Sequence, residues 1–222
     1  FRIGDPLVDW LQQHLVVDER GRASAIARPN SEISTPALWL HCEFLIEFDP
    51  GQGGVDDWPS RRRLARRGET HLQPIRLDTW TDPVGRAPDN VIDAVLGKPF
   101  DRDRDAILRG ASWQLILDEM PAWSTLCEQS ANVAWAEVRN DRTLASTLHA
   151  ALNAADQDSA RRIAILEARS LRLPTGSERD SAELELQRER ATADAVRAGI
   201  QNPSIRMVAC GACVLCPEEY FE

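Results

Sequence analysis

Apolar residues occupy every second position from Leu38 to Phe48, and this period-two pattern predicts a long strand with one apolar face. The turn sequence Asp49-Pro50-Gly51 ends it. A second strand is predicted over residues 70–81. Because consecutive strands are usually neighbours, we expect these two to pair antiparallel. Residues 22–36, which are mostly polar, are predicted to form a loop, and residues 1–20 a short helix.

Helical spacing dominates the second half of the chain. The run from Pro121 to Leu173 has no internal proline or glycine, and apolar or small residues recur every three or four positions. We expect a long helix with a break around residues 153–156, and a second helix over residues 177–200. The turn Pro174-Thr175-Gly176 joins them into an antiparallel hairpin. Shorter helices are predicted at residues 90–96 and 103–117, and a final strand at residues 205–216.

These elements predict an α+β fold with a small, mostly antiparallel sheet and a long antiparallel helical hairpin. The sheet-containing portion, with its N-terminal helix, is assigned to residues 1–120 and the hairpin arm to residues 121–202. Residues 203–222 hold the final strand, which returns to the sheet. The sequence opens on Phe1-Arg2-Ile3 without an initiator Met or a signal-peptide pattern. We therefore expect one structural domain cut from a larger protein.

Composition narrows the classes of function. Of the 222 residues 43% are apolar and 27% charged, and no apolar run approaches the length that spans a membrane. We expect a cytoplasmic protein with no membrane partner. The net charge of −9 repels a phosphate backbone, so any nucleic-acid contact must come from a local basic patch. The 25 Arg against a single Lys indicate the codon usage of a GC-rich, bacterial genome.

One such patch lies in the segment between the two predicted strands. It consists of Arg61, Arg62, Arg63, Arg66 and Arg67. Guanidinium groups bind phosphates well, and at the tip of a glycine-flanked loop they are candidates for binding an anion. The alternative is a solvated loop that the acidic residues nearby partly neutralise. Among the seven Trp residues, Trp39 and Trp58 are candidate partner contacts.

Cysteines form the sharpest local pattern. Cys210, Cys213 and Cys216 have a spacing that resembles iron–sulfur or zinc ligation, but such sites normally need four ligands. In a strand, side chains alternate between faces, so Cys210 and Cys216 would point away from Cys213. We therefore predict a core strand and no metal. Cys42 and Cys127 are the remaining thiols, and no disulfides are expected.

Catalytic motifs are not found. Gly97-Lys98 is the one Gly-Lys pair, and its neighbours do not fit a phosphate-binding loop. Neither a GxGxxG motif nor a nucleophile elbow is present. We expect no catalytic residue and no cofactor in this chain.

Two short motifs frame the predicted elements. Gly4-Asp5-Pro6-Leu7-Val8 opens the first helix, and Asn202-Pro203-Ser204-Ile205-Arg206 leads into the last strand. With the sheet and hairpin between them, they resemble the C-terminal domain of bacterial Swi/Snf-type ATPases of the RNA polymerase-associated RapA/HepA kind, including phage-defence relatives. In that family a Gly-x-Pro-Leu-Val opening leads from the second motor lobe into the C-terminal domain.

The resemblance implies a parent helicase or translocase that binds ATP and Mg, hydrolyses ATP and moves on double-stranded DNA. This chain would then be a non-catalytic regulatory or docking domain that contacts the rest of the parent, and RNA polymerase or another protein. No catalytic residue carries over. Two alternatives remain: a stand-alone nucleic-acid- or protein-binding module that uses the Arg61–Arg67 loop, and a metal or redox protein that uses Cys210, Cys213 and Cys216.

Overall fold

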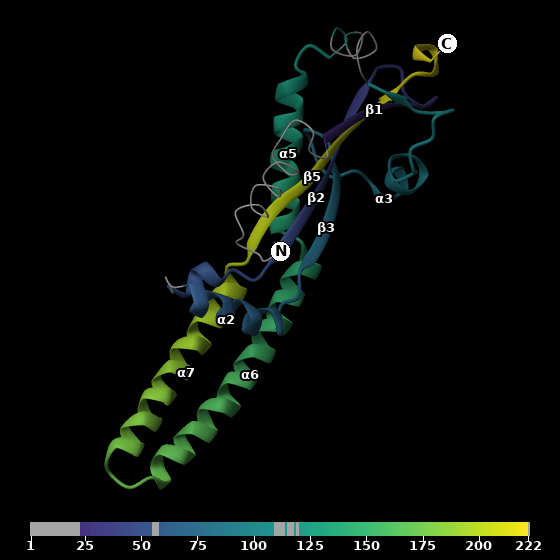
Figure 1. Cartoon of the computed structure of the whole chain (residues 1–222). Helices are drawn as coiled ribbons and strands as arrows, with labels where there is room; N and C mark the ends of the chain where they lie inside the picture. The colour runs from purple at the N-terminus through teal and green to yellow at the C-terminus, as the bar shows by residue number, and fades with distance from the viewer. Residues whose placement is uncertain (1–22, 55–57, 109–113, 115–117, 119, 222) are drawn as a thin grey trace. The chain divides into compact units, whose positions relative to one another are not determined.

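The computed structural model describes residues 23–54, 58–108, 114, 118 and 120–221 (Figure 1). Over these residues it contains five α-helices and a five-stranded mixed sheet, which confirms the α+β class. The helix predicted for residues 1–20 lies outside the described residues. In the described part of the chain, no helix combines the length and the apolar character needed to cross a membrane.

The sheet has the strand order β3-β2-β5-β1-β4. The strands are β1 (Ala23–Pro29), β2 (Ala37–Glu47), β3 (Ile75–Thr81), β4 (Ala106–Ile107) and β5 (Ser204–Cys216). The final strand does return to the sheet, as predicted. It runs parallel to β1, with Ala23 opposite Cys210, whereas β1 and β4 pair antiparallel. The expectation of a mostly antiparallel sheet is therefore only partly right, because β5 enters beside β1 in the same direction.

Two strands were not foreseen. β1 lies in the segment predicted to be a loop at residues 22–36, and β4 lies where a helix was predicted at residues 103–117. Both segments lack the bulky alternation that marks β2. In β1 the residues are mostly small, and its one charged side chain, Arg28, is buried rather than exposed. Because a charged residue occupies a core position in β1, the apolar alternation that would predict a strand is interrupted there.

The helices are α2 (Trp58–Glu69), α3 (Asp89–Val91), α5 (Trp123–Arg139), α6 (Arg142–Arg172) and α7 (Ser177–Gln201), with shorter helical turns η1 (Pro50–Gly53), η2 (Ile92–Leu96) and η3 (Glu218–Tyr220). The long helix breaks at Asn140, not at residues 153–156. Asp141 causes the break, because its carboxylate accepts a hydrogen bond from the Leu144 amide at 2.6 Å and caps α6. Ala151 and Ala155 are buried, so α6 continues through the predicted break.

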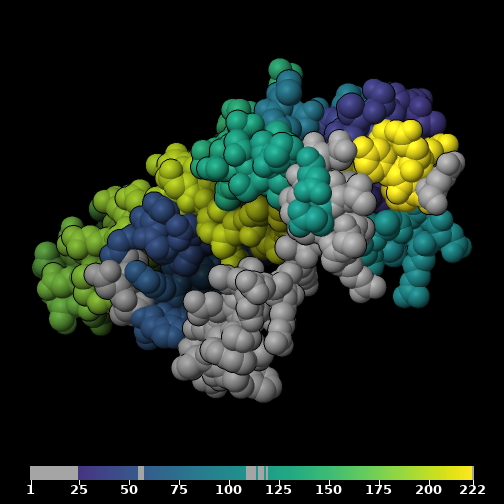
Figure 2. Space-filling view, turned by 90° about the horizontal axis from the view of Figure 1, so that it is seen from above, coloured from purple at the N-terminus to yellow at the C-terminus, as the bar shows by residue number. Residues whose placement is uncertain are grey.

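The chain divides into two compact units. The sheet unit comprises Phe1–Phe44, Arg76–Asn140 and Met207–Glu222, and the hairpin unit comprises Leu45–Ile75 and Asp141–Arg206. Helix α5, which the sequence pattern joins to the hairpin arm, belongs to the sheet unit. In the hairpin unit α6 and α7 run side by side and antiparallel (Figure 1), and α2 lies against α7 (Figure 2).

The sheet unit has apolar clusters on both faces of the sheet. On one face Val214 and Cys216 pack with Trp123 and Leu126, the latter two from α5. On the other face Cys213 and Leu215 pack with Leu96 and other residues of the segment that includes η2. The hairpin unit has its own core, which contains Phe48, Leu64, Leu72, Ala151, Ala155, Ala195, Val196 and Ile200.

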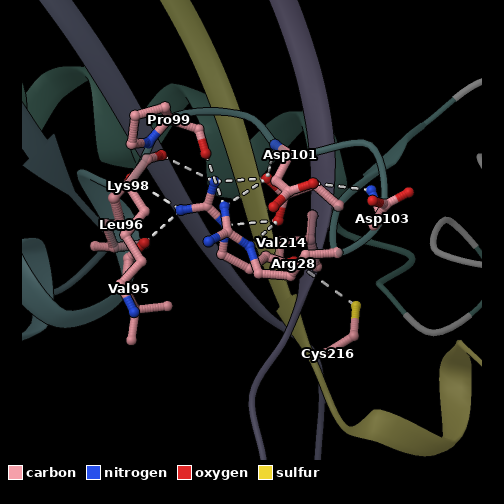
Figure 3. Close-up of polar contacts among 11 residues, drawn as sticks. Arg28, Val95, Leu96, Lys98, Pro99, Asp101, Asp103, Val214 and Cys216 are labelled. Carbon is pink, nitrogen blue, oxygen red and sulfur yellow. Dashed lines mark hydrogen bonds and ion pairs between the residues drawn. The ribbon is translucent and has the colours of Figure 1, made fainter.

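A buried ion pair ties β1 to the segment that precedes β4 (Figure 3). The Arg28 guanidinium is bidentate to the Asp105 carboxylate, with both hydrogen bonds at 2.8 Å. Its remaining donors reach the main-chain carbonyls of Val95, Leu96 and Lys98. Arg104, whose side chain is 30% exposed, binds the same carboxylate. The charge is thus compensated, and every donor group of the guanidinium has an acceptor.

Candidate functional site

The arginine cluster lies on a helix and not on a loop. Residues 61–67 form the central turns of α2, so the prediction of a loop was wrong. Leu64 is the one bulky apolar residue that α2 buries, and it is accompanied by the small residue Gly68. The segment is mostly polar and has a single bulky residue to bury, and the glycines before it favour a loop assignment.

Two glycines bring α2 and α7 close to the Phe48 ring. A Cβ atom on Gly68 would lie 2.5 Å from Cδ1 of this ring, and one on Gly199 would lie 2.7 Å from Cζ. Both distances are shorter than van der Waals contact allows. The ring therefore lies between the two helix backbones, and this packing fixes the orientation of α2 within the hairpin unit.

Arg67 is the member of the cluster that points inward. Its Nη1 donates to Oε2 of Glu189 at 2.9 Å, and its Nη2 pairs with the second carboxylate oxygen. Both side chains are mostly buried, with 15% and 16% exposure. Nη2 also lies 3.5 Å from the Ser159 hydroxyl. Since its charge is already paired with a carboxylate of α7, Arg67 is a structural residue of the hairpin unit.

The other four arginines form an exposed surface, here called the arginine face: Arg61, Arg62, Arg63 and Arg66. The Arg62 guanidinium lies 5.7 Å from the centre of the Trp58 ring, which is 52% exposed. Arg63 makes only long contacts, to the Pro59 carbonyl at 3.4 Å and the Ser60 hydroxyl at 3.5 Å. Among the described residues, no carboxylate pairs with Arg62, Arg63 or Arg66.

The distribution of charge favours this surface as an anion contact. Acidic and basic residues are equal in number in the hairpin unit, so the net charge of −9 belongs entirely to the sheet unit. Five arginines of α6 and α7 form ion pairs with carboxylates of these two helices: Arg162, Arg169, Arg179, Arg190 and Arg197. The arginine face, by contrast, places four exposed positive charges close together on one short helix. Trp58 adds an aromatic surface beside it, whereas Trp39 packs in the core of the sheet unit.

The three cysteines of β5 do not converge, as predicted. Cys213 lies in the cluster with Leu96, and Cys216 lies on the opposite face with Val214. Burial raises the pKa of Cys213 to about 12 and that of Cys216 to about 11, so both remain neutral thiols. Across the described residues, no group of three or more His, Cys, Asp or Glu side chains could hold a metal ion. All five cysteines are free thiols.

Cys210 has partners that the sequence did not indicate. It lies with Cys42 of β2 and Cys127 of α5, two thiols that are distant from it along the chain. Only the sheet order reveals this, because β5 is inserted next to β2. The separation of these three cysteines along the sequence does not indicate that they lie close together.

Replacing Arg67 by Gln is expected to lower the free energy of unfolding by about 1–2 kcal/mol, because Glu189 would keep a mostly buried charge without its partner. The effect is limited because Nε of Arg67 already lacks a partner among the described residues. Urea unfolding measures it. Replacing the exposed neighbour Arg66 by Gln is the control and should change stability by less than about 0.5 kcal/mol. Equal effects of the two changes would contradict a structural role for Arg67.

No known protein-family model matches this sequence, and the search of curated proteins found no significant match.

Proposed function

We propose that the chain is a non-catalytic docking module of an ATP-dependent DNA translocase of the Swi/Snf type, and that the arginine face of α2 binds the phosphate backbone of double-stranded DNA. The observation that carries the DNA contact is the exposure of the Arg62, Arg63 and Arg66 side chains, for which the described part of the chain contains no carboxylate partner. The link to a translocase rests on the resemblance of the two framing motifs and on the order of sheet, hairpin and final strand.

Phosphate binding suits the geometry of this helix. Guanidinium groups form paired hydrogen bonds with phosphate oxygens, and each contact releases condensed counterions from DNA. Arg62, Arg63 and Arg66 are carried on a helix whose position is fixed by the glycine contacts with Phe48 and by the Arg67–Glu189 pair. A fixed spacing reduces the entropy lost on binding. Trp58 can pack against a sugar or a base edge beside the phosphates.

ATP hydrolysis would be a property of the parent protein. The chain has no phosphate-binding loop and no acidic helicase box. ATP and Mg would therefore bind to the motor lobes, and the hairpin would extend toward a partner such as RNA polymerase. In this arrangement the module adds affinity for DNA without taking part in the chemical step.

Changing Arg62, Arg63 and Arg66 together to Gln is expected to weaken binding to a labelled DNA duplex. If each makes one phosphate contact, the slope of log affinity against log salt should fall by roughly 2 to 3. Fluorescence anisotropy at several salt concentrations measures both quantities. The matched control changes Arg161, Arg172 and Arg188 to Gln, which removes the same charge from exposed positions of the same unit.

Equal losses in the two triple variants would show that binding reflects only diffuse charge, and would contradict the assignment to α2. So would a duplex affinity that does not depend on salt. The link to a motor is tested separately, by sequencing the coding DNA upstream of Phe1. An in-frame phosphate-binding loop and helicase box are expected there. If DNA binding is found without them, the chain acts as a stand-alone nucleic-acid-binding module.

A further inference from the structure

Three cysteine thiols meet in the sheet unit, on the face of the sheet that α5 covers. Cys42 lies on β2 and Cys210 on β5, and these strands are hydrogen-bonded neighbours. Cys42 and Cys210 lie on the same face of their strands as Leu40 and Ala212, and the two thiols are close enough to perturb each other's pKa. Cys127 of α5 lies near them and lines a cavity together with Cys210. Burial as small apolar side chains accounts for each cysteine alone, but not for the gathering of three thiols from three elements of the fold.

A cavity of about 450 Å³ opens onto this cluster. Cys127 and Cys210 line it, together with Ala25, Leu40, Trp123, Glu128, Ala131 and Ala212. Both lining thiols are partly exposed, whereas Cys42 lies beneath with no exposed surface. A small reagent that enters the cavity therefore meets Cys127 and Cys210, whereas Cys42 is buried and does not line the cavity.

The two thiols of the pair differ in chemical character. The interaction with Cys42 lowers the pKa of Cys210, although burial opposes this. The same interaction and burial raise the pKa of Cys42 well above its ordinary value. Burial also raises the pKa of Cys127. Of the three thiols, Cys210 is thus the one whose pKa is shifted toward the thiolate, which is the reactive form of cysteine.

We propose that Cys210 is a peroxide-reactive thiol and that Cys42 is its resolving thiol, so that oxidation joins β2 and β5 through a reversible disulfide. The oxidant is a hydroperoxide small enough to enter the cavity. This site lies in the sheet unit and does not depend on the DNA-binding role of α2.

The chemistry has two balanced steps. The Cys210 thiolate attacks one peroxide oxygen, the O–O bond breaks, and the leaving oxygen takes up a proton to give water or an alcohol. Cys210 is then a sulfenic acid. The Cys42 sulfur next attacks the Cys210 sulfur, the S–O bond breaks, and the hydroxyl leaves as water with the Cys42 proton. The two thiols lose two electrons in all, and the peroxide gains them.

The backbone permits this bond. Neighbouring strands lie about 4.8 Å apart, and disulfides join Cα atoms that are usually about 4.4–6.8 Å apart. Cys42 and Cys210 also lie on the same face of the sheet, because Leu40 and Ala212, two residues away from each, line the same cavity. Cys213 cannot compete, since its side chain lies on the opposite face of the sheet.

Treatment of the whole chain with hydrogen peroxide tests the proposal. Intact mass spectrometry is expected to show the loss of two hydrogen atoms, and peptide mapping should assign the new bond to Cys42 and Cys210. Dithiothreitol should reverse the change. The Cys213→Ala variant is the matched control from the same strand, and it should form the disulfide as the unmodified chain does. No oxidation of Cys210, or a bond between Cys210 and Cys127, would overturn the assignment.

A second variant separates the two steps. In Cys42→Ala the first step remains, so peroxide should leave a sulfenic acid on Cys210 that dimedone traps. Circular dichroism confirms that this variant is folded before the test. If dimedone labels Cys127 or Cys216 in preference to Cys210, the proposal is wrong. Should the variant fail to fold, the competition between dimedone and disulfide formation in the unmodified chain gives the same information, because early dimedone adducts must be on Cys210.

Discussion

Replacing Asp105 by Asn should lower the free energy of unfolding by about 3–5 kcal/mol, because it leaves a buried guanidinium without its counter-charge. Arg28 is 2% exposed, so water does not replace the lost partner while this packing is kept. The neutral amide also has only one oxygen in place of the two that Nε and Nη2 use at 2.8 Å. Urea unfolding followed by circular dichroism measures the difference.

Two further variants test the reason for this loss. The exposed neighbour Asp103 changed to Asn should alter stability by less than about 0.5 kcal/mol. The double variant Arg28→Met, Asp105→Leu should recover much of the loss, because apolar residues of similar volume remove the buried charge as well as its partner. A loss below about 1 kcal/mol in Asp105→Asn would show that the pair is not buried in solution.

The same carboxylate predicts a dependence on pH. Burial alone would raise the pKa of Asp105, but hydrogen bonds from Arg104 and Arg28 outweigh it and hold this pKa well below its ordinary value. A depressed pKa adds stability that is fully present above the unfolded-state pKa, about 3.9. The contribution is therefore constant at neutral and mildly acidic pH, and it declines as the pH falls from about 4 toward the folded-state pKa.

Replacing Gly199 by Ala is expected to lower the free energy of unfolding by about 2–3 kcal/mol. In an ordinary helix interior this change stabilises by about 1 kcal/mol. Here the new Cβ would lie 2.6 Å from the Asp49 carbonyl oxygen, a main-chain atom that cannot turn away. It would also meet the Phe48 ring, which Gly68 confines from the other side.

The contact with Phe48 can be isolated by a double-mutant cycle. In a Phe48→Leu background the ring is gone, so Gly199→Ala should cost less than it does in the unmodified chain. Gly85→Ala is the control, because a Cβ at Gly85 meets no atom within 4 Å. Stabilisation by Gly199→Ala would show that α7 and Phe48 are less closely packed than the structure has them.

Helices and strands in which bulky apolar residues recur at a regular spacing could be predicted from the sequence. The period-two alternation of β2 places its buried residues at every second position, and the structure shows the same alternation. The hairpin follows from two long periodic stretches and the turn Pro174-Thr175-Gly176. By contrast β1 could not be predicted, since its small residues and Arg28 acquire a core position only through β5 and Asp105. The break between α5 and α6 could have been predicted, because Asp141 is an acidic residue of the type that caps the start of a helix, and it caps α6.

The candidate sites divide in the same way. Arg61 to Arg67 stand out by composition, but their separation into one inward and four outward side chains depends on the contact of α2 with Glu189. The cysteine spacing in β5 was recognised, and the period of a strand correctly excluded convergence of Cys213 with its neighbours. The proximity of Cys42 to Cys210 depends on strand order, which is a property of the whole sheet and not of any local segment.

Strand order also has a consequence for synthesis on the ribosome. β5 is the last strand along the chain, yet it lies between β2 and β1 in the sheet. Until it has emerged, β1 has no parallel partner and β2 keeps one side open, so the nascent chain carries unpaired strand edges from the synthesis of β1 until that of β5. The helical hairpin depends on nearer contacts and can form earlier. We expect chaperones that shield strand edges to bind the growing chain until its final strand is released.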